Sequence, residues 1–486
     1  MIFKSKTRVI LALLGLVVLC LIGFVILEKV LGNNRVEKAR AAYIADGGSF
    51  DRTSGFAKPV PDDENFGAIP LLNGITAETP AGDLVRDKLA EIGLNKSGHS
   101  WPRPDKDKRK PKRKHGHELR QKRDLALFES FFIDIGLLTS ASDPAQLEAK
   151  LFDAYESAHG TSFAELHAGS SRPSAVLLPL AVDRYDPQRL MWSLSNKELR
   201  GAQNLAKGLM LHAHLALRTD RSDVALADVR SMNQLAVAVQ ADGSNLIAHL
   251  VGIAINSMLL EPTWEGIADH RWTEAQLREL QSLFLARDIA EEMREALRGE
   301  IIFMDEMYSN IGEALAATSS TDALAPLIKP WADHNQAQVL EFYHKDLLQA
   351  SQAPDGYIQA KKNAETTTAT LEAKAPYNPR YALARMTIPS MSAFTNKSAR
   401  THAELQMAAA ACALERYYLT NQDYPDKLES LVPDFAEKVA TDPVNGKPLH
   451  YQKTIDGRYQ LYSIGADGAD NLGHTGDITW GYATAP

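Results

Sequence analysis

The sequence predicts a mainly α-helical protein with an N-terminal transmembrane helix, a helical body and a small α+β domain at the C-terminus. Three observations lead to this fold class: an uncharged apolar run at 9–27, apolar stripes of helical period from 124 to about 375, and strand and turn patterns confined to the end of the chain. The 486 residues are 45% hydrophobic and 23% charged, as in an ordinary globular protein with room for two or three domains. We divide the chain into an anchor at 1–30, a linker with a basic stretch at 31–123, a helical domain at 124–390 and a C-terminal domain at 391–486.

The anchor is the apolar run 9–27. Its length is close to the ~20 residues that a helix needs to cross the hydrocarbon core of a bilayer, and three basic residues precede it, Lys4, Lys6 and Arg8. A cleaved signal peptide is the alternative, but it would have a shorter apolar core followed directly by a small-x-small cleavage site. Here Glu28 and Lys29 intervene before the small residues at 39–41. We therefore expect an uncleaved single span whose partner is the inner-membrane lipid bilayer.

The linker contains a proline-rich part and a basic part. Proline argues against a long helix near 59–70, and 83–92 is expected to form one short helix. The stretch 103–123 is densely basic, which predicts contact with anionic lipid or an acidic polymer. The alternative is a solvated charged linker, which is what most charge runs are. The net charge of −8 argues against a specific nucleic-acid partner.

The body is expected to be a stack of antiparallel helices. Apolar stripes predict helices at 196–217, 224–239 and 246–260, and Thr273 is expected to open a fourth helix that runs through Leu297. Short turns separate them. This pattern resembles a tetratricopeptide-type hairpin stack, although no fixed period recurs, so antiparallel packing is the coarser expectation.

No catalytic or metal-binding motif stands out in the body. His212 and His214 are two positions apart, so on a helix they face different sides and cannot hold one metal ion. The sequence also lacks the helical zinc motif, the nucleophile elbow, the phosphate loop and the dinucleotide fingerprint. We expect these histidines to be ordinary partly buried or surface side chains. Cys20 and Cys412 lie in distant segments and predict no disulfide.

The C-terminal domain begins with an alanine-rich helix. Its apolar positions recur at steps of four and three from Ala403 to Tyr417, and Pro425 cannot continue it. The stretches 449–453 and 458–464 predict two short strands. Asp456-Gly457 between them suits the positive φ of a tight hairpin.

The tail of this domain carries a candidate calcium site. Four oxygen-bearing side chains lie within eleven positions and alternate with glycine: Asp467, Asp470, Asn471 and Asp477. Calcium prefers six to eight oxygen ligands, and flexible turns let backbone carbonyls join carboxylates. The alternative is a solvated turn, since Asp, Asn and Gly are common turn residues.

The order of these C-terminal motifs resembles the globular domain of the major pseudopilins of type II secretion systems. The motifs are Leu414-Glu415-Arg416-Tyr417-Tyr418, Asp442-Pro443, 462–468 and 476–478. The resemblance implies a calcium loop in which the Ile464 carbonyl and the carboxylates of Asp467 and Asp477 are ligands. The segment His474-Thr475-Gly476 departs from it, because that family usually has further acidic or serine residues there. The run 23–28 superficially matches a prepilin cleavage motif, but its apolar helix lies before the glutamate instead of after it, so the anchor differs from that of a pilus subunit.

The whole chain also resembles a largely uncharacterised type of bacterial membrane-anchored protein with a helical body and this C-terminal domain. The resembling pieces are 60–66, 223–229 and Asp442-Pro443. Basic residues flank the apolar run almost equally, so the positive-inside rule does not fix the orientation. We expect a cytoplasmic N-terminus with the bulk outside the cytoplasm, because the pseudopilin domain works there in its own family.

Two functions are compatible with the sequence. The first is a non-enzymatic envelope scaffold with a protein partner, which the missing catalytic constellation favours. The resemblance to pseudopilins extends this function to a secretion-related role. The second is an envelope hydrolase whose acid and base are carboxylates of the helical body, a pairing that sequence spacing cannot reveal.

Overall fold

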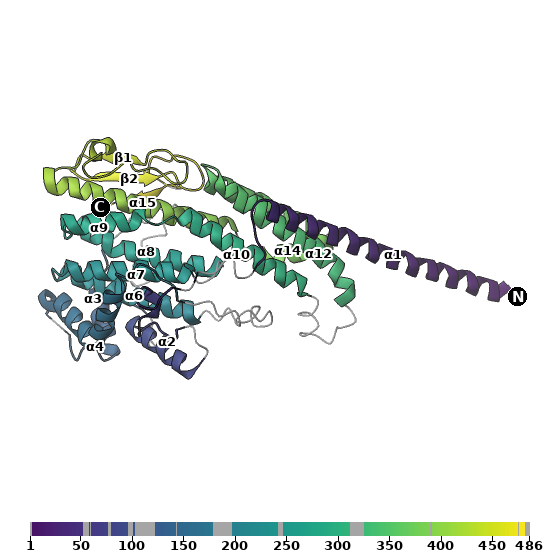
Figure 1. Cartoon of the computed structure of the whole chain (residues 1–486), viewed down its shortest axis with the longest axis horizontal. Helices are drawn as coiled ribbons and strands as arrows, with labels where there is room; N and C mark the ends of the chain where they lie inside the picture. Colours follow the sequence, from purple (N-terminus) through teal and green to yellow (C-terminus); the bar gives the residue numbers. More distant parts are fainter. Residues whose placement is uncertain are drawn as a thin grey trace.

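The computed structural model describes residues 2–51, 58, 60–75, 79–95, 101–102, 122–141, 143–177, 197–241, 246–311, 325–388, 391–474 and 476–481. The protein is mainly helical, with one small antiparallel sheet at the C-terminus (Figure 1). The N-terminal and linker elements are α1 (Ile2–Ala45), η2 (Phe66–Ala68) and α2 (Pro80–Ile92). The body contains α3 (Ala126–Asp134), η4 (Pro144–Gln146), α4 (Leu147–Gly169), α6 (Lys197–Arg218), α7 (Ser222–Ala241), α8 (Leu246–Ala268), α9 (Glu274–Leu285), α10 (Ile289–Ser309), α12 (Ala325–Glu341), the π-helix η7 (Phe342–Gln349), η8 (Ala350–Gln352), α13 (Gly356–Lys374), η9 (Pro379–Tyr381) and α14 (Ala382–Thr387). The C-terminal part comprises α15 (Met391–Asn421), η10 (Leu428–Leu431), β1 (His450–Lys453), β2 (Tyr459–Ser463) and β3 (Ile478–Trp480).

Helix α1 is long and apolar enough to cross a membrane, as the sequence predicts. The apolar side chains between 13 and 27 are exposed, and this part of α1 projects away from the rest of the molecule (Figure 1). Helix α8 also passes the test of length and composition, but most of it is buried in the body. An exposed apolar helix in water is costly, whereas in a bilayer it is the expected surface.

The helix does not end where the linker was expected to begin. Residues 31–45 continue α1 and pack along α12, with Val36, Ala39 and Tyr43 buried at the contact. These three positions recur at steps of three and four, which places them on one face of the helix. The anchor is therefore joined to the body by packed helix, and the predicted linker starts only after Ala45.

The body is a layered stack of helices. Helices α6, α7 and α8 pack on one another, and α15 packs across α8 and α9 on the side of the stack that faces the sheet (Figure 1). The predicted helices at 196–217, 224–239 and 246–260 correspond to α6, α7 and α8. Thr273 opens α9, as expected from the sequence, and it does so through a capping box with Gln276.

The fourth predicted helix is wrong in its length. It was expected to run through Leu297, but it ends at Leu285, and α10 begins at Ile289. Asp288 caps the new helix by accepting a hydrogen bond from the backbone N–H of Glu291. Arg287, in the break, is buried and donates to Glu292 and Gln240.

The segment around 60–75 docks onto the body through Asn65. Its side-chain amide donates to the carbonyl oxygen of Val176 at 2.9 Å, and its oxygen accepts from the Val176 N–H at 2.8 Å. The same oxygen accepts from the N–H of Gly67. A Cβ at Gly67 would lie 1.9 Å from the Val176 oxygen, so only glycine fits this approach. The backbone around Asn65 forms a parallel bridge with Ser174, and the Asn65 side chain extends this pairing to Val176.

The C-terminal part has the expected helix and hairpin. Strands β1, β2 and β3 form an antiparallel sheet in that order, and β1 and β2 are joined through Gly457 at a φ of +78°. Helix α15 packs against both the sheet and the body helices α8 and α9. On the body side, Arg416 of α15 donates to Glu274 and Gln281 of α9. Residues after 391 thus share their apolar core with the body, so position 391 does not separate two cores.

Candidate functional site

Helix α6 carries two buried histidines that face opposite sides, as their spacing predicts. His212 points to α4 and α7, where its Nδ1 lies 2.8 Å from Asp228 Oδ2 and its Nε2 lies 3.2 Å from Glu156 Oε1. His214 points to α8, where its Nδ1 lies 2.9 Å from Glu265 Oε2. Both side chains are almost fully buried, which corrects the expectation of partly buried or surface histidines. Each histidine holds the layer of α6 to a different neighbour.

The His212 ring is held between aromatic and acidic groups. It stacks on Phe163 with a centroid distance of 4.0 Å and on Phe152 with a distance of 5.1 Å. Burial disfavours the imidazolium, but the Asp228 and Glu156 carboxylates outweigh that cost and raise the pKa of His212 to about 9. Burial likewise opposes the ionisation of Asp228, while the two histidines that contact it keep its pKa below the ordinary value. His212 is therefore a buried cation at neutral pH.

His167 completes this group and raises the question of a metal ion. Its Nε2 lies 2.7 Å from Asp228 Oδ1, so Asp228 binds one histidine with each oxygen. Among the described residues, His167, His212 and Asp228 are the three ligand-type side chains whose atoms all lie within 4.8 Å of one another. Two ligands about 2.05 Å from a tetrahedral zinc ion would lie roughly 3.3 Å apart. The shorter contacts of 2.7 and 2.8 Å are those of charge-assisted hydrogen bonds, so the group is a network of protons and charges.

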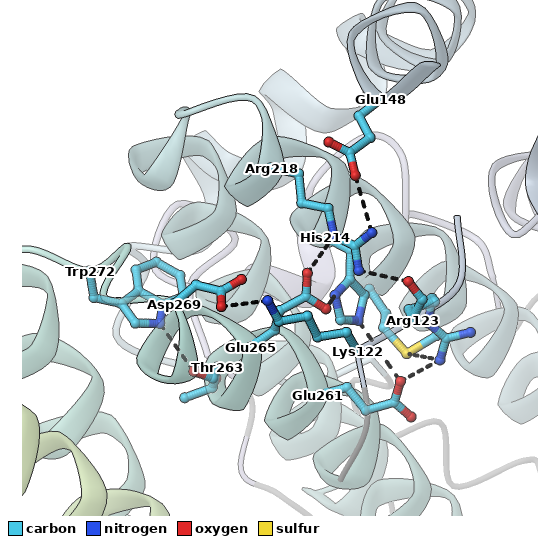
Figure 2. Close-up of polar contacts among 11 residues, drawn as sticks. Lys122, Arg123, Glu148, His214, Arg218, Glu261, Thr263, Glu265, Asp269 and Trp272 are labelled. Carbon is cyan, nitrogen blue, oxygen red and sulfur yellow. Dashed lines mark hydrogen bonds and ion pairs between the residues drawn. The ribbon is translucent and has the colours of Figure 1, made fainter. Parts of the chain in front are cut away.

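On the other side of α6, His214 belongs to a second ionic network (Figure 2). Glu265, which is 2% exposed, accepts from Nε of Arg218 at 2.6 Å, and Arg218 also donates to Glu148. Burial disfavours the Glu265 carboxylate, but His214 and Arg218 lower its pKa to about 2. Arg123 donates to Glu261 one turn earlier on α8. At one end of the network Arg218 pairs with Glu148, and at the other end Arg123 pairs with Glu261.

The described end of the basic stretch belongs to this second network. Lys122 Nζ lies 2.6 Å from Asp269 Oδ1 (Figure 2), and Arg123 lies over the ring of Trp101 at 5.8 Å from its centroid. Trp101 itself donates to the carbonyl oxygen of Gly93. On one flank of the basic stretch Trp101 is held at Gly93 after α2, and on the other flank Lys122 and Arg123 are held at α8 and the residue that follows it. The rest of the predicted contact region, 103–121, lies outside the described residues.

These arrangements bear on acid–base chemistry in the body. The carboxylates of Asp228 and Glu265 are held ionised by cations, so they do not serve as proton donors at neutral pH. Glu300 of α10 is different, because burial raises its pKa to about 7 against a hydrogen bond from the backbone of Leu246.

A cavity of about 120 Å³ lies between α10 and α13, beside Met293 and Tyr357. It is smaller than the ~300 Å³ of typical small-molecule pockets.

The predicted calcium-site residues lie in one loop after β2. Asp477 accepts from the backbone N–H groups of Asn471 and Gly473, and Asp470 accepts from the N–H of Leu472. Asp467 accepts from the N–H of Ala469, while its other oxygen and the Asn471 amide converge beside Gly476. A Cβ at Gly476 would lie 2.5 Å from Asp467 Oδ2 and 2.7 Å from Asn471 Nδ2.

The charges of this loop are close to one another. Burial raises the pKa of Asp477, and the neighbouring carboxylates of Asp470 and Asp467 raise it further, against the two backbone N–H groups that bind it. Ile464 precedes the loop, and its N–H donates to Asp442 Oδ2 at 3.0 Å. The structure thus brings together the carboxylates that the sequence singled out, around glycine turns and backbone donors.

Sequence reasoning missed the structural role of three buried polar side chains. Asn65 joins 60–75 to Val176, Asp228 binds two histidines, and Asp442 accepts from Ser463 Oγ and from the N–H groups of Val444 and Ile464. Only for Asp228 was there an indication in the sequence, because it is an acidic residue inside the otherwise apolar run 224–229.

An ion cluster around Glu28 lies where α1 leaves the body. Glu28, 2% exposed, is the first buried side chain after the exposed apolar part of α1. Arg380 donates to it from Nε at 2.9 Å and from a second nitrogen, and His334 Nε2 lies 3.1 Å from it. Further along α1, Arg40 donates to Asp305 through two nitrogens, each at 2.9 Å.

Comparisons with protein-family models, with curated proteins and with solved structures found no match to this chain.

Proposed function

We propose that the protein is a membrane-anchored scaffold of the cell envelope, with α1 as the span and the helical body as a platform for a protein partner. The observation that carries the proposal is the junction at Glu28. The apolar side chains before it are exposed, and every turn of α1 after it packs on the body or pairs with it. Such a helix fixes the body to a bilayer.

The state of the body's carboxylates favours a scaffold over a hydrolase. Asp228 and Glu265 are committed to histidine and arginine partners, and such buried pairs act as structural ties. A hydrolase of the kind considered from the sequence would need one carboxyl group that donates a proton and another that accepts it.

In this proposal the N-terminus is cytoplasmic and the body is extracytoplasmic. The C-terminal part, which resembles the pseudopilin domain, caps the stack through α15 and presents the 464–477 loop at the surface. Relation to a secretion system is the finer form of the same proposal and rests on that resemblance.

Membrane extraction tests the anchor. The full chain is expected to remain in the membrane fraction in alkaline carbonate. A variant with Leu16→Arg and Leu19→Arg is expected to be released, because each arginine costs roughly 2.5–3.5 kcal/mol at the centre of a span. A control with Leu285→Arg and Leu472→Arg changes two exposed side chains outside α1 and is expected to stay membrane-bound. Release of the unmodified chain would contradict the anchor.

Partner capture tests the scaffold. Photo-crosslinking residues placed on the exposed faces of the body should yield one specific envelope protein from intact cells, and membrane protection assays should place that body outside the cytoplasm. Turnover of an ester, peptide or glycoside by the purified chain, abolished by Asp228→Asn with the fold intact, would replace the scaffold with the hydrolase.

Calcium binding by Ile464, Asp467, Asp470, Asn471 and Asp477 is a further part of the proposal. Support comes from the grouping of the Asp467, Asp470 and Asp477 carboxylates in one glycine-rich loop, where Asp470 and Asp467 contribute to the raised pKa of Asp477. A cation there would relieve the repulsion between the carboxylates. The expected result is a higher Tm of the full chain in calcium than in chelator, since ligands that bind only the folded state stabilise it.

The calcium test has matched controls. Asp467→Ala should abolish the calcium-dependent rise in Tm, whereas Asp456→Ala, in the β1–β2 turn, should leave it unchanged. The full chain is needed because α15 is covered by α9 and would be exposed in an isolated domain. An equal rise in Tm for the Asp467→Ala variant would remove the site.

A further inference from the structure

We infer that the protein makes a second contact with the bilayer through a collar formed by Lys374, Tyr377, Arg385 and Met386, which rests in the head-group layer beside the span. This inference rests on the proposed anchoring by α1. It adds a surface of the body that meets lipid and so fixes how the body sits on the membrane.

The first argument is the level of the collar along α1. Arg380 lies within it in sequence and binds Glu28, the first buried residue after the exposed apolar run. The head-group layer on each side of the hydrocarbon core is about 5–8 Å thick. A residue that contacts Glu28 therefore lies at the depth of that layer when the apolar run fills the core.

The second argument is that the whole segment is held at this level. Asn335 of α12 donates to the carbonyl oxygen of Pro379 at 3.0 Å and accepts from the N–H of Ala384 at 2.9 Å. Asn335 follows His334, which lies against Glu28. Helix α14 packs on α12 and is labelled beside it in Figure 1. Helix α14 has six residues, so its length of about 9 Å keeps Arg385 and Met386 near the same level.

The third argument is exposure. Tyr377 is 90% exposed and Met386 is 81% exposed. Outside α1, the large hydrophobic side chains exposed in the described part of the chain are Leu84, Leu285, Tyr377, Met386, Ile455 and Leu472. Single exposed apolar residues are normal in soluble proteins. Two of these six lie within six positions of Arg380, at the level of the membrane surface, where tyrosine is a preferred interfacial residue.

The fourth argument is charge. Lys374 Nζ lies 5.1 Å from the ring centroid of Tyr381, and Arg385 is exposed on α14. Glu372 is the exposed acidic side chain nearest in sequence. Two basic groups against one acidic group, combined with tyrosine and methionine, suit a layer of phosphate head groups over acyl chains.

The experiment measures the depth of single fluorophores in the full chain, reconstituted in lipid nanodiscs. The background is Cys20→Ser, and Cys412 is retained because it is fully buried and burial raises the pKa of its thiol. An environment-sensitive dye is attached in turn at Tyr377→Cys, Met386→Cys, Leu19→Cys in the span and Ile455→Cys in the β1–β2 turn. The lipids carry a nitroxide quencher either on the head group or deep in the acyl chain.

The expected result is loss of fluorescence at positions 377 and 386 with the head-group nitroxide, and at position 19 with the acyl-chain nitroxide. Position 455 should lose little with either. If position 19 is quenched but positions 377 and 386 lose no more than position 455, the collar is overturned and the anchor stands. If position 19 is not quenched by the acyl-chain nitroxide, the anchor fails and the collar fails with it.

A charge-reversal arm tests the role of the basic side chains. With anionic lipid, the losses at 377 and 386 should be larger than with zwitterionic lipid alone. Lys374→Glu combined with Arg385→Glu should remove that difference, whereas Lys438→Glu, an exposed lysine of the C-terminal part, should preserve it. If chains that retain Lys374 and Arg385 lose the same fluorescence at 377 and 386 in anionic and in zwitterionic lipid, the electrostatic part of the contact is overturned.

Discussion

Arg380 and Glu28 form an ion pair across 352 positions of sequence, at the point where α1 leaves the body. Glu28 is buried, whereas Arg380 is 39% exposed, so the arginine retains contact with water while the carboxylate depends on its partners. The pair is the first contact that ties the span to the rest of the fold.

Removing this carboxylate should loosen the junction. We expect Glu28→Gln to lower the free energy of unfolding by about 1–2 kcal/mol, because a buried charge-assisted hydrogen bond is lost while Arg380 can still reach water. Glu37→Gln, which removes an exposed partner of Arg40, should cost less than about 1 kcal/mol. Denaturant unfolding in detergent measures both. A double-mutant cycle with Arg380→Gln that gives purely additive effects would show that the pair contributes nothing.

The Asp228 network should be the most sensitive polar site in the body. Asp228→Asn leaves His212 as a buried cation with one partner fewer, so we expect a loss of roughly 3–5 kcal/mol. Asp153→Asn, an exposed matched change on α4, should have almost no effect. Thermal unfolding measures both variants. A zinc-dependent rise in Tm that Asp228→Asn abolishes would show instead that the group holds a metal ion.

Glu300 should make stability depend on pH. Its folded-state pKa of about 7 lies above the ordinary value of 4.5, so the folded state binds the proton more tightly than the unfolded state. The stability of the native protein should therefore fall as pH rises from about 4.5 to 7 and then level off for this group. Glu300→Gln should remove this loss and be more stable than the native protein at pH 8, by up to roughly 3 kcal/mol.

Comparing Tm for the native protein and Glu300→Gln across this pH range tests the sign. Glu295→Gln, an exposed change on the same helix, serves as the control. A difference in Tm between Glu300→Gln and the native protein that is constant with pH would contradict the raised pKa.

Asn65 should be irreplaceable even by aspartate. In Asn65→Asp a carboxylate oxygen would replace the amide that donates to the Val176 carbonyl, leaving two oxygens 2.9 Å apart. We expect a loss of about 2–3 kcal/mol from the unpaired buried groups. Asn73→Asp, in the exposed turn that follows, should be nearly neutral. Protease cleavage within 60–75 at native conditions should rise in the first variant alone.

Sequence patterns predicted the turns and helix ends that depend on residues close to one another in the chain. The Asp456-Gly457 turn, the start of α9 after Thr273 and the end of α15 before Pro425 all follow from nearby residues. The break after Leu285 was missed although Asp288 and Glu291 form a recognisable capping pattern, because the apolar period continues across it. Arg287 in this break is buried and donates to side chains of α7, α8 and α10, and these long-range contacts favour the break although the apolar pattern continues.

The candidate sites could be predicted only in part. The loop residues 467–477 are close in sequence, so their grouping was accessible. The partners of Asp228 are 16 and 61 positions away, and those of Glu28 lie more than 300 positions away. Pairings over such distances are set by how the helices stack, which hydrophobic period alone does not specify. Glu28 therefore looked like the charged flank of an apolar run.

Because α1 is one continuous helix, a change in the tilt of its apolar half would also rotate the body. The 44 residues of α1 extend about 66 Å, and the second half packs along α12; in the proposed anchoring the first half lies in the membrane. A change of span tilt by about 20°, within the range that transmembrane helices adopt, would swing a point about 60 Å away through roughly 20 Å. In the proposed anchoring, bilayer thickness and lateral tension would therefore act on the orientation of the body through the tilt of α1, and the contacts of Tyr377 and Met386 with the head groups would oppose such a rotation.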